Sequence, residues 1–305
     1  MKKFYSILLA LIITGLFSAC SDGEKHIIEL RLEKGKTYTQ HLVSSMGMKQ
    51  TVMNKQESTE VGMTASMSFT VKEVAGDQYE LEVVYDKLSL DLQDMPLAQS
   101  LMSAETIDQS NMLKALTGQP FTMTITRSGE IESIKGLDKL FAEFLRQAND
   151  SLGDSEKLEL EAQLQKTYGE KALRNNFQQA FMFLPGEPVA IGDEWYDTLQ
   201  VRGELPMQFE SRFKLVDIKG NNYILSNISN LNVESSTGSN SAGIQMNLSG
   251  EANGEMKIDT SSGWINESKL TQSIHGELSY PGNRLFPDGL TMPINVEIKM
   301  NMSAE

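Results

Sequence analysis

The chain has 305 residues, of which 40% are hydrophobic and 22% charged, and its net charge is −14. This balance excludes a disordered chain, a fibrous one and a protein that crosses a membrane many times. The excess of acidic residues argues against a nucleic-acid partner, because phosphate binding needs clustered Lys and Arg. The single cysteine excludes an internal disulfide framework and a cysteine-based metal cage, and we expect no cofactor and no metal site.

The first 19 residues are typical of a signal peptide. A positively charged start precedes residues 4–16, which are almost wholly apolar but too few to span a bilayer, because a spanning helix needs roughly 20 residues. The small pair Ser18-Ala19 before Cys20 resembles the lipobox of bacterial lipoproteins, which implies that the Cys20 sulfur receives a diacylglycerol. The alternative is an ordinary secretory signal with an incidental cysteine. We predict lipidation at Cys20 and attachment to the membrane through acyl chains.

An acidic stretch, Ser21-Asp-Gly-Glu24, follows the cysteine directly. It resembles the tether that directs some bacterial lipoproteins to the cell surface, and it fits a plain solvated linker equally well. We therefore predict an outer-membrane lipoprotein of the bacterial cell envelope that is either periplasmic or surface-exposed. The sequence leaves its leaflet, its protein partner and its oligomeric state open.

Alternation of apolar with polar or small residues predicts strands in residues 63–71, 79–85 and 294–302. Period two of this quality is typical of antiparallel strands that have one covered face and one wet face.

An internal repeat organises these strands. Residues 69–81 match residues 213–225 at every apolar position, with Gly76-Asp77 and Gly220-Asn221 where a tight hairpin turn belongs. Two further landmarks recur in the same order: Gly35 to Tyr38 corresponds to Gly192 to Trp195, and Gly129-Glu-Ile131 corresponds to Gly263-Trp-Ile265. The apolar phase before the last two glycines differs by one residue, which suggests a bulge or a misalignment. Three landmarks in one order favour duplication over two generic hairpins.

Helical periodicity marks the region between the two halves. One apolar stripe begins at Leu137 and recurs at steps of three and four residues, and another ends before Pro185. Asp154 is a candidate N-cap for the second stretch, and Gly169 is a candidate break within it. Pro96 to Leu116 is a weaker helical candidate inside the first half. The plainest interpretation is that the aromatic residues of these helices pack on the sheet as core.

Several short motifs resemble a family of bacterial lipoproteins known only as a domain of unknown function. They are Phe181-Met-Phe-Leu-Pro185, Pro188-Val189, Gly192-Asp-Glu-Trp195 and Thr126-Arg-Ser-Gly129-Glu-Ile131. The resemblance implies an exported, lipid-anchored and mostly β protein. It implies no activity and no catalytic residue.

We predict an α+β fold that is mainly antiparallel β, with curved, duplicated sheets and a central helical segment. By analogy of architecture alone, it resembles the half-barrel of periplasmic lipoprotein carriers. The two repeats are expected to form one structural unit. The expected divisions are a signal peptide (1–19), a lipidated tether (20–26), repeat 1 with a short helical insertion (27–135), a helical segment (136–185) and repeat 2 (186–305).

Catalytic motifs are missing from the sequence, which has no HExxH, GxSxG, P-loop or GxGxxG. The unusual signal is methionine, with 17 residues. Met46-x-Met48 could bind Cu(I), but soft-metal sites usually recruit His or Cys as well, and only His41 is near. A concave sheet lined by flexible Met side chains could instead adapt to variable apolar ligands, although the same residues could simply fill a core. The candidate ligand-binding residues are Met46, Met48, Met63, Met67, Phe69, Met300 and Met302.

Three functions remain open. The first is a non-catalytic, lipid-anchored envelope protein that binds a lipid or another apolar or amphiphilic ligand in a concave sheet. The second is a structural or interaction subunit of a surface complex, which would use strand edges or loops as contacts. The third is a hydrolase whose carboxylate site leaves no local motif.

Overall fold

The computed structural model describes residues 23–52, 55–93, 116–147, 153–201, 207–235, 245–282 and 287–304. Cys20, the signal peptide and residues 96–115 of the predicted helical insertion lie outside the described residues. The elements are β1 (Thr37–Val52), β2 (Lys55–Ala75), β3 (Gln78–Gln93), β4 (Pro120–Thr126), β5 (Ile131–Lys135), α4 (Leu137–Gln147), α5 (Asp154–Tyr168), α6 (Glu170–Phe181), β6 (Glu194–Val201), β7 (Met207–Lys219), β8 (Asn222–Ser235), β9 (Gln245–Asp259), β10 (Ile265–Tyr280) and β11 (Leu290–Ser303).

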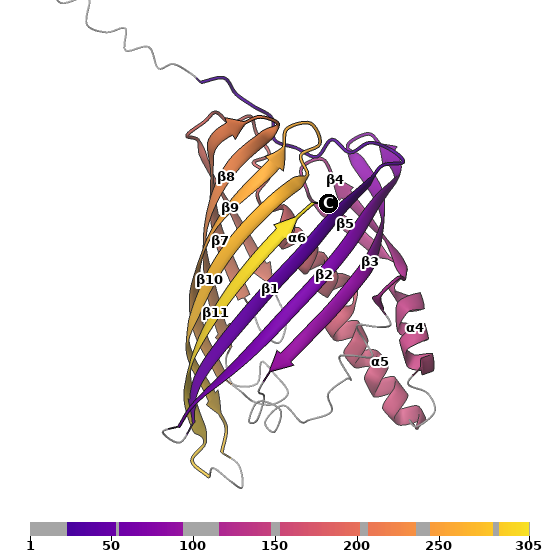
Figure 1. The fold of residues 1–305 in the computed structure, drawn as a ribbon. Helices are drawn as coiled ribbons and strands as arrows, with labels where there is room; N and C mark the ends of the chain where they lie inside the picture. The colour runs from indigo at the N-terminus through magenta and orange to yellow at the C-terminus, as the bar shows by residue number, and fades with distance from the viewer. Residues whose placement is uncertain are drawn as a thin grey trace, which may run out of the picture.

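All of these strands form one curved antiparallel sheet, in the order β5-β4-β3-β2-β1-β11-β10-β9-β8-β7-β6. The chain starts in the middle of the sheet at β1, moves outward to β5, crosses through the helices to β6 at the other edge, and returns to β11 (Figure 1). The mainly antiparallel fold was predicted correctly, but the predicted plural sheets are a single sheet. The reason is that β11 pairs with β1, from His41 opposite Ser303 to Gln50 opposite Ile294.

The sequence repeat extends to the backbone hydrogen bonds. The register between β2 and β3 shifts just after Val71, and the register between β7 and β8 shifts just after Leu215, the equivalent residue. The Gly35 amide donates to the Val71 carbonyl at 2.8 Å, and the Gly192 amide donates to the Leu215 carbonyl at 2.7 Å. A β-bulge bends its strand, so a bulge at the same position bends both halves of the sheet in the same way.

The one-residue difference in apolar phase between the halves lies in a turn. Ile125 pairs with Ile131 across the β4–β5 turn, and Ile258 pairs with Ile265 across the β9–β10 turn. The second turn is therefore one residue longer than the first. Because both turns return the chain to the same register, the insertion leaves the pairing of the flanking strands unchanged.

The helices connect the two edges of the sheet and cover part of one face. Helices α4 and α6 lie where the apolar stripes predict them, and Gly169 separates α5 from α6. Helix α6 buries Phe177, whose ring lies 6.2 Å from that of Phe69 on β2. Its Gln178 accepts from the Ile131 amide at 2.9 Å and donates to the Gly129 carbonyl at 3.0 Å, so the helix is joined to the edge strand β5. We call the face of the sheet that carries Tyr38, Phe69 and α6 the inner face.

Close contacts between β9 and β10 require glycine on the inner face. A Cβ atom at Gly254 would lie 2.8 Å from the Lys269 carbonyl oxygen, and one at Gly250 would lie 2.7 Å from that of Ser273. Side chains at these positions would push the two strands apart, so the glycines permit the tight coiling of the sheet here.

The N-terminal segment (residues 26–34) crosses the upper end of the sheet and joins both halves (Figure 1). The Leu30 amide donates to the Arg127 carbonyl in the β4–β5 turn, and the Arg31 amide donates to the Ser262 carbonyl in the β9–β10 turn, both at 2.8 Å. Leu30 has no exposed surface, and its carbonyl accepts from the Tyr79 hydroxyl at 2.9 Å. The segment therefore closes the upper end of the core.

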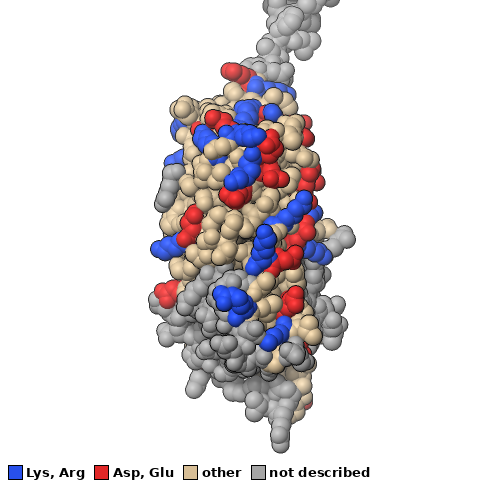
Figure 2. Space-filling model, turned by 90° about the vertical axis from the view of Figure 1, so that its right-hand side faces the viewer, with Lys and Arg blue, Asp and Glu red and all other residues tan. Residues whose placement is uncertain are grey.

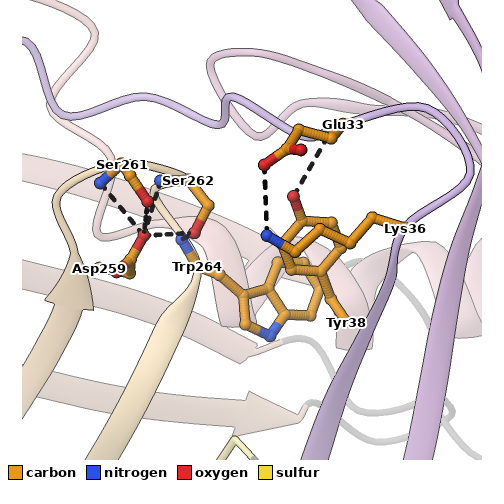
Figure 3. Close-up of polar contacts among 7 residues, drawn as sticks. All are labelled: Glu33, Lys36, Tyr38, Asp259, Ser261, Ser262 and Trp264. Carbon is orange, nitrogen blue, oxygen red and sulfur yellow. Dashed lines mark hydrogen bonds and ion pairs between the residues drawn. The ribbon is translucent and has the colours of Figure 1, made fainter.

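The longer turn is stabilised by a carboxylate that accepts several hydrogen bonds (Figure 3). Asp259 Oδ1 accepts from the backbone amides of Ser261 and Ser262 at 3.1 and 2.7 Å and from both hydroxyls. Partial burial raises the pKa of Asp259, but these hydrogen bonds outweigh it and leave the pKa below its usual value. Trp264 lies at the end of this turn, and the centroid of its ring is 5.2 Å from that of Tyr38.

One hydrophobic core extends across both halves, and it includes Leu81 and Ile125 from the first half and Leu215 and Ile258 from the second.

Positive and negative side chains are intermingled on the surface that faces the right-hand side of Figure 1 (Figure 2). None of the described helices has both the length and the apolar character needed to cross a bilayer.

Candidate ligand-binding face

The seven predicted ligand-binding residues lie on the inner face of three adjacent strands, β2, β1 and β11. Met46 and Met48 of β1 lie opposite Val61 and Thr59 of β2 and opposite Ile298 and Val296 of β11. Ser44 lies opposite both Met63 and Met300, Leu42 opposite Met302, Gln40 opposite Met67, and Tyr38 opposite Phe69. Residues that are more than 200 positions apart in the sequence thus line one surface.

The upper part of this surface is core. Phe69 is 3% exposed, and its ring lies 5.1 Å from that of Trp264. Met67 and Met302 are partly buried and pack against the same core. These three residues act as packing side chains, and Phe69 in particular is enclosed beneath helix α6.

The lower part of the surface is different. We define the lower inner face as the half-buried inner-face side chains of the three strands below the core. They are Leu42, Ser44, Met46, Met48, Val61, Met63, Val296, Ile298 and Met300. The outward-facing neighbours on the same strands, such as Val43, Ser45 and Lys49, are exposed. Half-burial of so many apolar side chains means that water is only partly excluded from this surface.

Helix α6 is much shorter than the strands on which it packs. Helix α6 has 12 residues and spans about 18 Å at 1.5 Å per residue. Strand β1 has 16 residues and extends for about 53 Å at 3.3 Å per residue. The helix therefore covers only the upper part of the strand, while α4 and α5 lie to the side in Figure 1.

Polar side chains lie at the lower rim of this face. Gln50 and Thr59 are 8% and 4% exposed, and Gln50 lies opposite Glu57 in the register of β1 with β2. The Glu57 Oε2 atom is buried and has no hydrogen-bond partner among the described residues. We did not single out these residues from the sequence, although the alternation of Glu57, Thr59 and Val61 with Met63 would have placed them on the same face.

A second group of buried polar side chains lies on the inner face of the other half. The Ser211 and Ser229 hydroxyls are 2.7 Å apart, and Ser229 donates to the Asn227 Oδ1 atom at 3.0 Å. These three side chains therefore hydrogen-bond to one another. On β1, the Gln40 Nε2 atom donates to the Ile265 carbonyl at 2.9 Å, while its Oε1 atom is buried without a partner.

A hollow of about 300 Å³ lies on the opposite, outer face, above two glycines of β1 and β2. Its lining includes Gly47, Gly62, Glu60, Asp91, Glu297 and Lys299.

Within the described parts of the chain, no group of His, Cys, Asp or Glu has the arrangement needed to hold a metal ion.

The titratable groups with clearly shifted pKa values serve structure. The hydrogen-bonded ammonium groups of Lys257 and Lys269 lower the pKa of Glu267 to about 2. Burial raises the pKa of Tyr85 to about 12, and its ring lies 6.1 Å from that of Phe121 in the core. His41 and His275 each lie within hydrogen-bond distance of a serine hydroxyl on the neighbouring strand, at 2.9 and 3.2 Å, so both histidines take part in cross-strand contacts.

A model of a family of unknown function (DUF6263) matches residues 76–265, from the β2–β3 turn to the start of β10. No curated protein matches the sequence.

Solved structures give only remote likenesses. The crystal structure of Pseudomonas aeruginosa OccK2 (OpdF) in complex with glucuronate is 7% identical, covers 90% of this chain and 100% of its own, and has a TM-score of 0.18. A DUF1329 family protein from Desulfovibrio piger is 9% identical, with 87% and 85% covered and a TM-score of 0.16. A LolA superfamily protein from Nitrosomonas europaea is 7% identical, with 89% and 87% covered and a TM-score of 0.13. Scores this low carry no argument about fold or function.

Proposed function

The chain belongs to a family of unknown function (DUF6263), and we propose that this member is a non-catalytic, lipid-anchored protein of the bacterial cell envelope that binds an apolar or amphiphilic ligand on the lower inner face. The observation that carries the proposal is the continuous, half-buried surface of Met, Ile, Val and Leu on β2, β1 and β11. In a hydrophobic core these side chains would be fully buried, and on a fully solvated surface most of these positions would hold polar residues.

The chemistry of the surface suits a ligand of variable shape. Met46, Met48, Met63 and Met300 have unbranched, polarizable side chains that repack easily. Each methylene of a ligand that is buried against them contributes about 0.8 kcal/mol, so an alkyl chain binds through its length alone. The ligand would shield these side chains from water, as α6 shields the inner-face residues farther up the strands.

The anchor belongs to the same proposal. Cys20 is the only cysteine, and the lipobox-like residues before it support attachment through acyl chains at the outer membrane. The N-terminal segment, with which the described chain begins, lies at the upper end of the fold (Figure 1). An anchor at that end would leave the lower inner face directed away from the anchoring membrane.

Binding is tested with protein that starts after Cys20 and with N-phenyl-1-naphthylamine, a neutral apolar fluorescent probe. We expect saturable binding, which Met46→Glu and Met63→Glu abolish because a charge on this surface would lose water without gaining a partner. Met46→Leu and Met63→Leu conserve volume and should keep binding. Val43→Glu adds the same charge to the exposed outer face of β1 and should also keep it. If Val43→Glu loses probe binding to the same extent, the probe does not bind specifically on the inner face, and the proposal is contradicted.

The anchor is tested by Cys20→Ser in the full chain. We expect the variant to lose labelling by a fatty-acid probe and to leave the membrane fraction, because the acidic mature chain has no basic attraction to anionic lipid. Unchanged labelling would contradict lipidation at Cys20.

A second candidate function, an interaction subunit, is favoured by exposed large apolar side chains that surround Arg212 near the β6 edge. Tyr196, Arg212 and Ile228 lie side by side across β6, β7 and β8, and Tyr196 is 72% exposed. Ile191 and Val216 are also exposed near this edge. Tyr196→Lys should weaken any concentration-dependent association in sedimentation velocity while leaving probe binding intact.

A further inference from the structure

A charged residue, Glu57, lies at the lower rim of the lower inner face, and Lys55 occupies the next inner-face position of β2 beyond it. The inner-face positions from Tyr38 to Gln50 on β1, from Glu57 to Phe69 on β2 and from Leu290 to Met302 on β11 hold apolar or uncharged polar residues, apart from Glu57. The basic residues in these stretches, such as Lys49 and Lys299, are at outer-face positions. A carboxyl group therefore lies at one end of a surface that is otherwise uncharged from there to the core.

One oxygen of that carboxyl group makes no hydrogen bond within the described parts of the protein. This Oε2 atom is buried, although a buried carboxyl oxygen without a donor is costly to stability. Glu57 itself is half-buried, and its neighbours on the same face, Gln50 and Thr59, are buried, so the site is a polar end to the apolar surface. A buried acceptor without a donor calls for an explanation, and a donor on a bound ligand would supply one.

We propose that Glu57 recognises the head group of the ligand, and that the ligand is a long-chain amphiphile with an ammonium head. This inference rests on the proposed binding of an apolar or amphiphilic ligand. An ammonium group supplies up to three donors and the opposite charge, whereas an ionised fatty acid would place a second negative charge beside Glu57. The alkyl chain would lie between β1 and β2, along the rungs from Met48 and Thr59 up to Ser44 and Met63.

The dimensions agree with this orientation. Glu57 and Met63 are six residues apart on β2, which corresponds to about 20 Å of strand at 3.3 Å per residue. An extended long alkyl chain covers such a length, so one molecule could reach from the lower rim to the edge of the core. The polar group of Ser211, Asn227 and Ser229 carries no formal charge, and its side chains hydrogen-bond to one another, which makes it a weaker site for an ammonium head.

The experiment measures how well dodecylamine, 1-dodecanol and dodecanoate displace N-phenyl-1-naphthylamine from the protein that starts after Cys20. The three competitors share a chain and differ in the head, and all are kept below micelle-forming concentrations. We expect dodecylamine to bind roughly tenfold or more tightly than 1-dodecanol, as for a hydrogen bond between charged groups, and dodecanoate to bind most weakly. Glu57→Gln should reduce the amine to the affinity of the alcohol and leave the alcohol unchanged.

Glu60→Gln is the matched control, because it removes the same charge from the same strand at an exposed outer-face position. It should keep the preference for the amine. Loss of the preference in Glu60→Gln, or its survival in Glu57→Gln, would assign it to overall charge and overturn the inference. Equal binding of all three competitors by the unchanged protein would overturn the inference but not the proposed function, whereas no displacement and no probe binding would overturn both. If Glu57→Gln proves unstable by circular dichroism, Glu57→Asp, which keeps the charge but withdraws it, should give an intermediate preference.

Discussion

Gly263 is the residue at which a single methyl group should do the most damage to the upper end of the fold. Its φ angle is +70°, and a Cβ atom there would lie 2.1 Å from the Glu29 carbonyl oxygen and 2.7 Å from its carbon. Both are backbone atoms of the N-terminal segment, so no side chain can rotate to make room. Gly263→Ala must therefore displace the segment.

The cost has two parts. An alanine in the left-handed region costs about 1–2 kcal/mol. Displacing the segment also breaks the hydrogen bonds from the Leu30 amide to Arg127 and from the Arg31 amide to Ser262, at about 1 kcal/mol each. We expect Gly263→Ala to lower the free energy of unfolding by about 3–4 kcal/mol.

Gly220→Ala separates the two parts. Gly220 also has a positive φ, +57°, but nothing lies within 4 Å of its added Cβ, so only the backbone cost of about 1–2 kcal/mol applies. The assay is urea unfolding followed by circular dichroism with linear extrapolation, together with hydrogen exchange of the Leu30 and Arg31 amides. Equal destabilisation by the two substitutions, with unchanged exchange at Leu30 and Arg31, would refute the closure of the core by this segment.

Two further predictions concern side-chain contacts. The folded-state pKa of Glu267 is lowered to about 2 by Lys257 and Lys269, so its contribution to stability is present above its ordinary pKa near 4.5 and is lost as the pH falls toward 2. Glu267→Gln should lower the free energy of unfolding at pH 7 by at most about 1 kcal/mol, because the ion pairs are partly exposed, and urea unfolding at pH 2 should show a smaller difference than at pH 7. Gln178→Leu should cost about 1–3 kcal/mol, because it leaves the Ile131 amide without its acceptor, and faster hydrogen exchange at that amide would locate the effect. A Gln178→Leu protein as stable as the original would mean that water replaces the bond without loss.

Local pattern was sufficient to place several elements of this protein. Alternation places strands at residues 63–71, 79–85 and 294–302 because successive strand side chains point to opposite faces, and these stretches lie in β2, β3 and β11. The apolar steps from Leu137 place α4, and Pro185 limits α6 because proline cannot continue a helix. The repeated hairpin pattern of residues 69–81 and 213–225 predicted tight turns at Gly76-Asp77 and Gly220-Asn221, and these residues connect β2 to β3 and β7 to β8.

Tertiary structure decided how these elements combine. The pairing of Met46 with Ile298 joins strands some 250 residues apart. The sequence of either strand does not determine its partner, because any two strands with alternating polarity can pair. The sequence marked Phe69, Met63 and Met46 as equivalent candidates, yet Phe69 is core and the two methionines are half-buried. Phe69 is core because helix α6 packs its Phe177 against it, and the surroundings of Glu57 depend on which residues the neighbouring strands bring beside it.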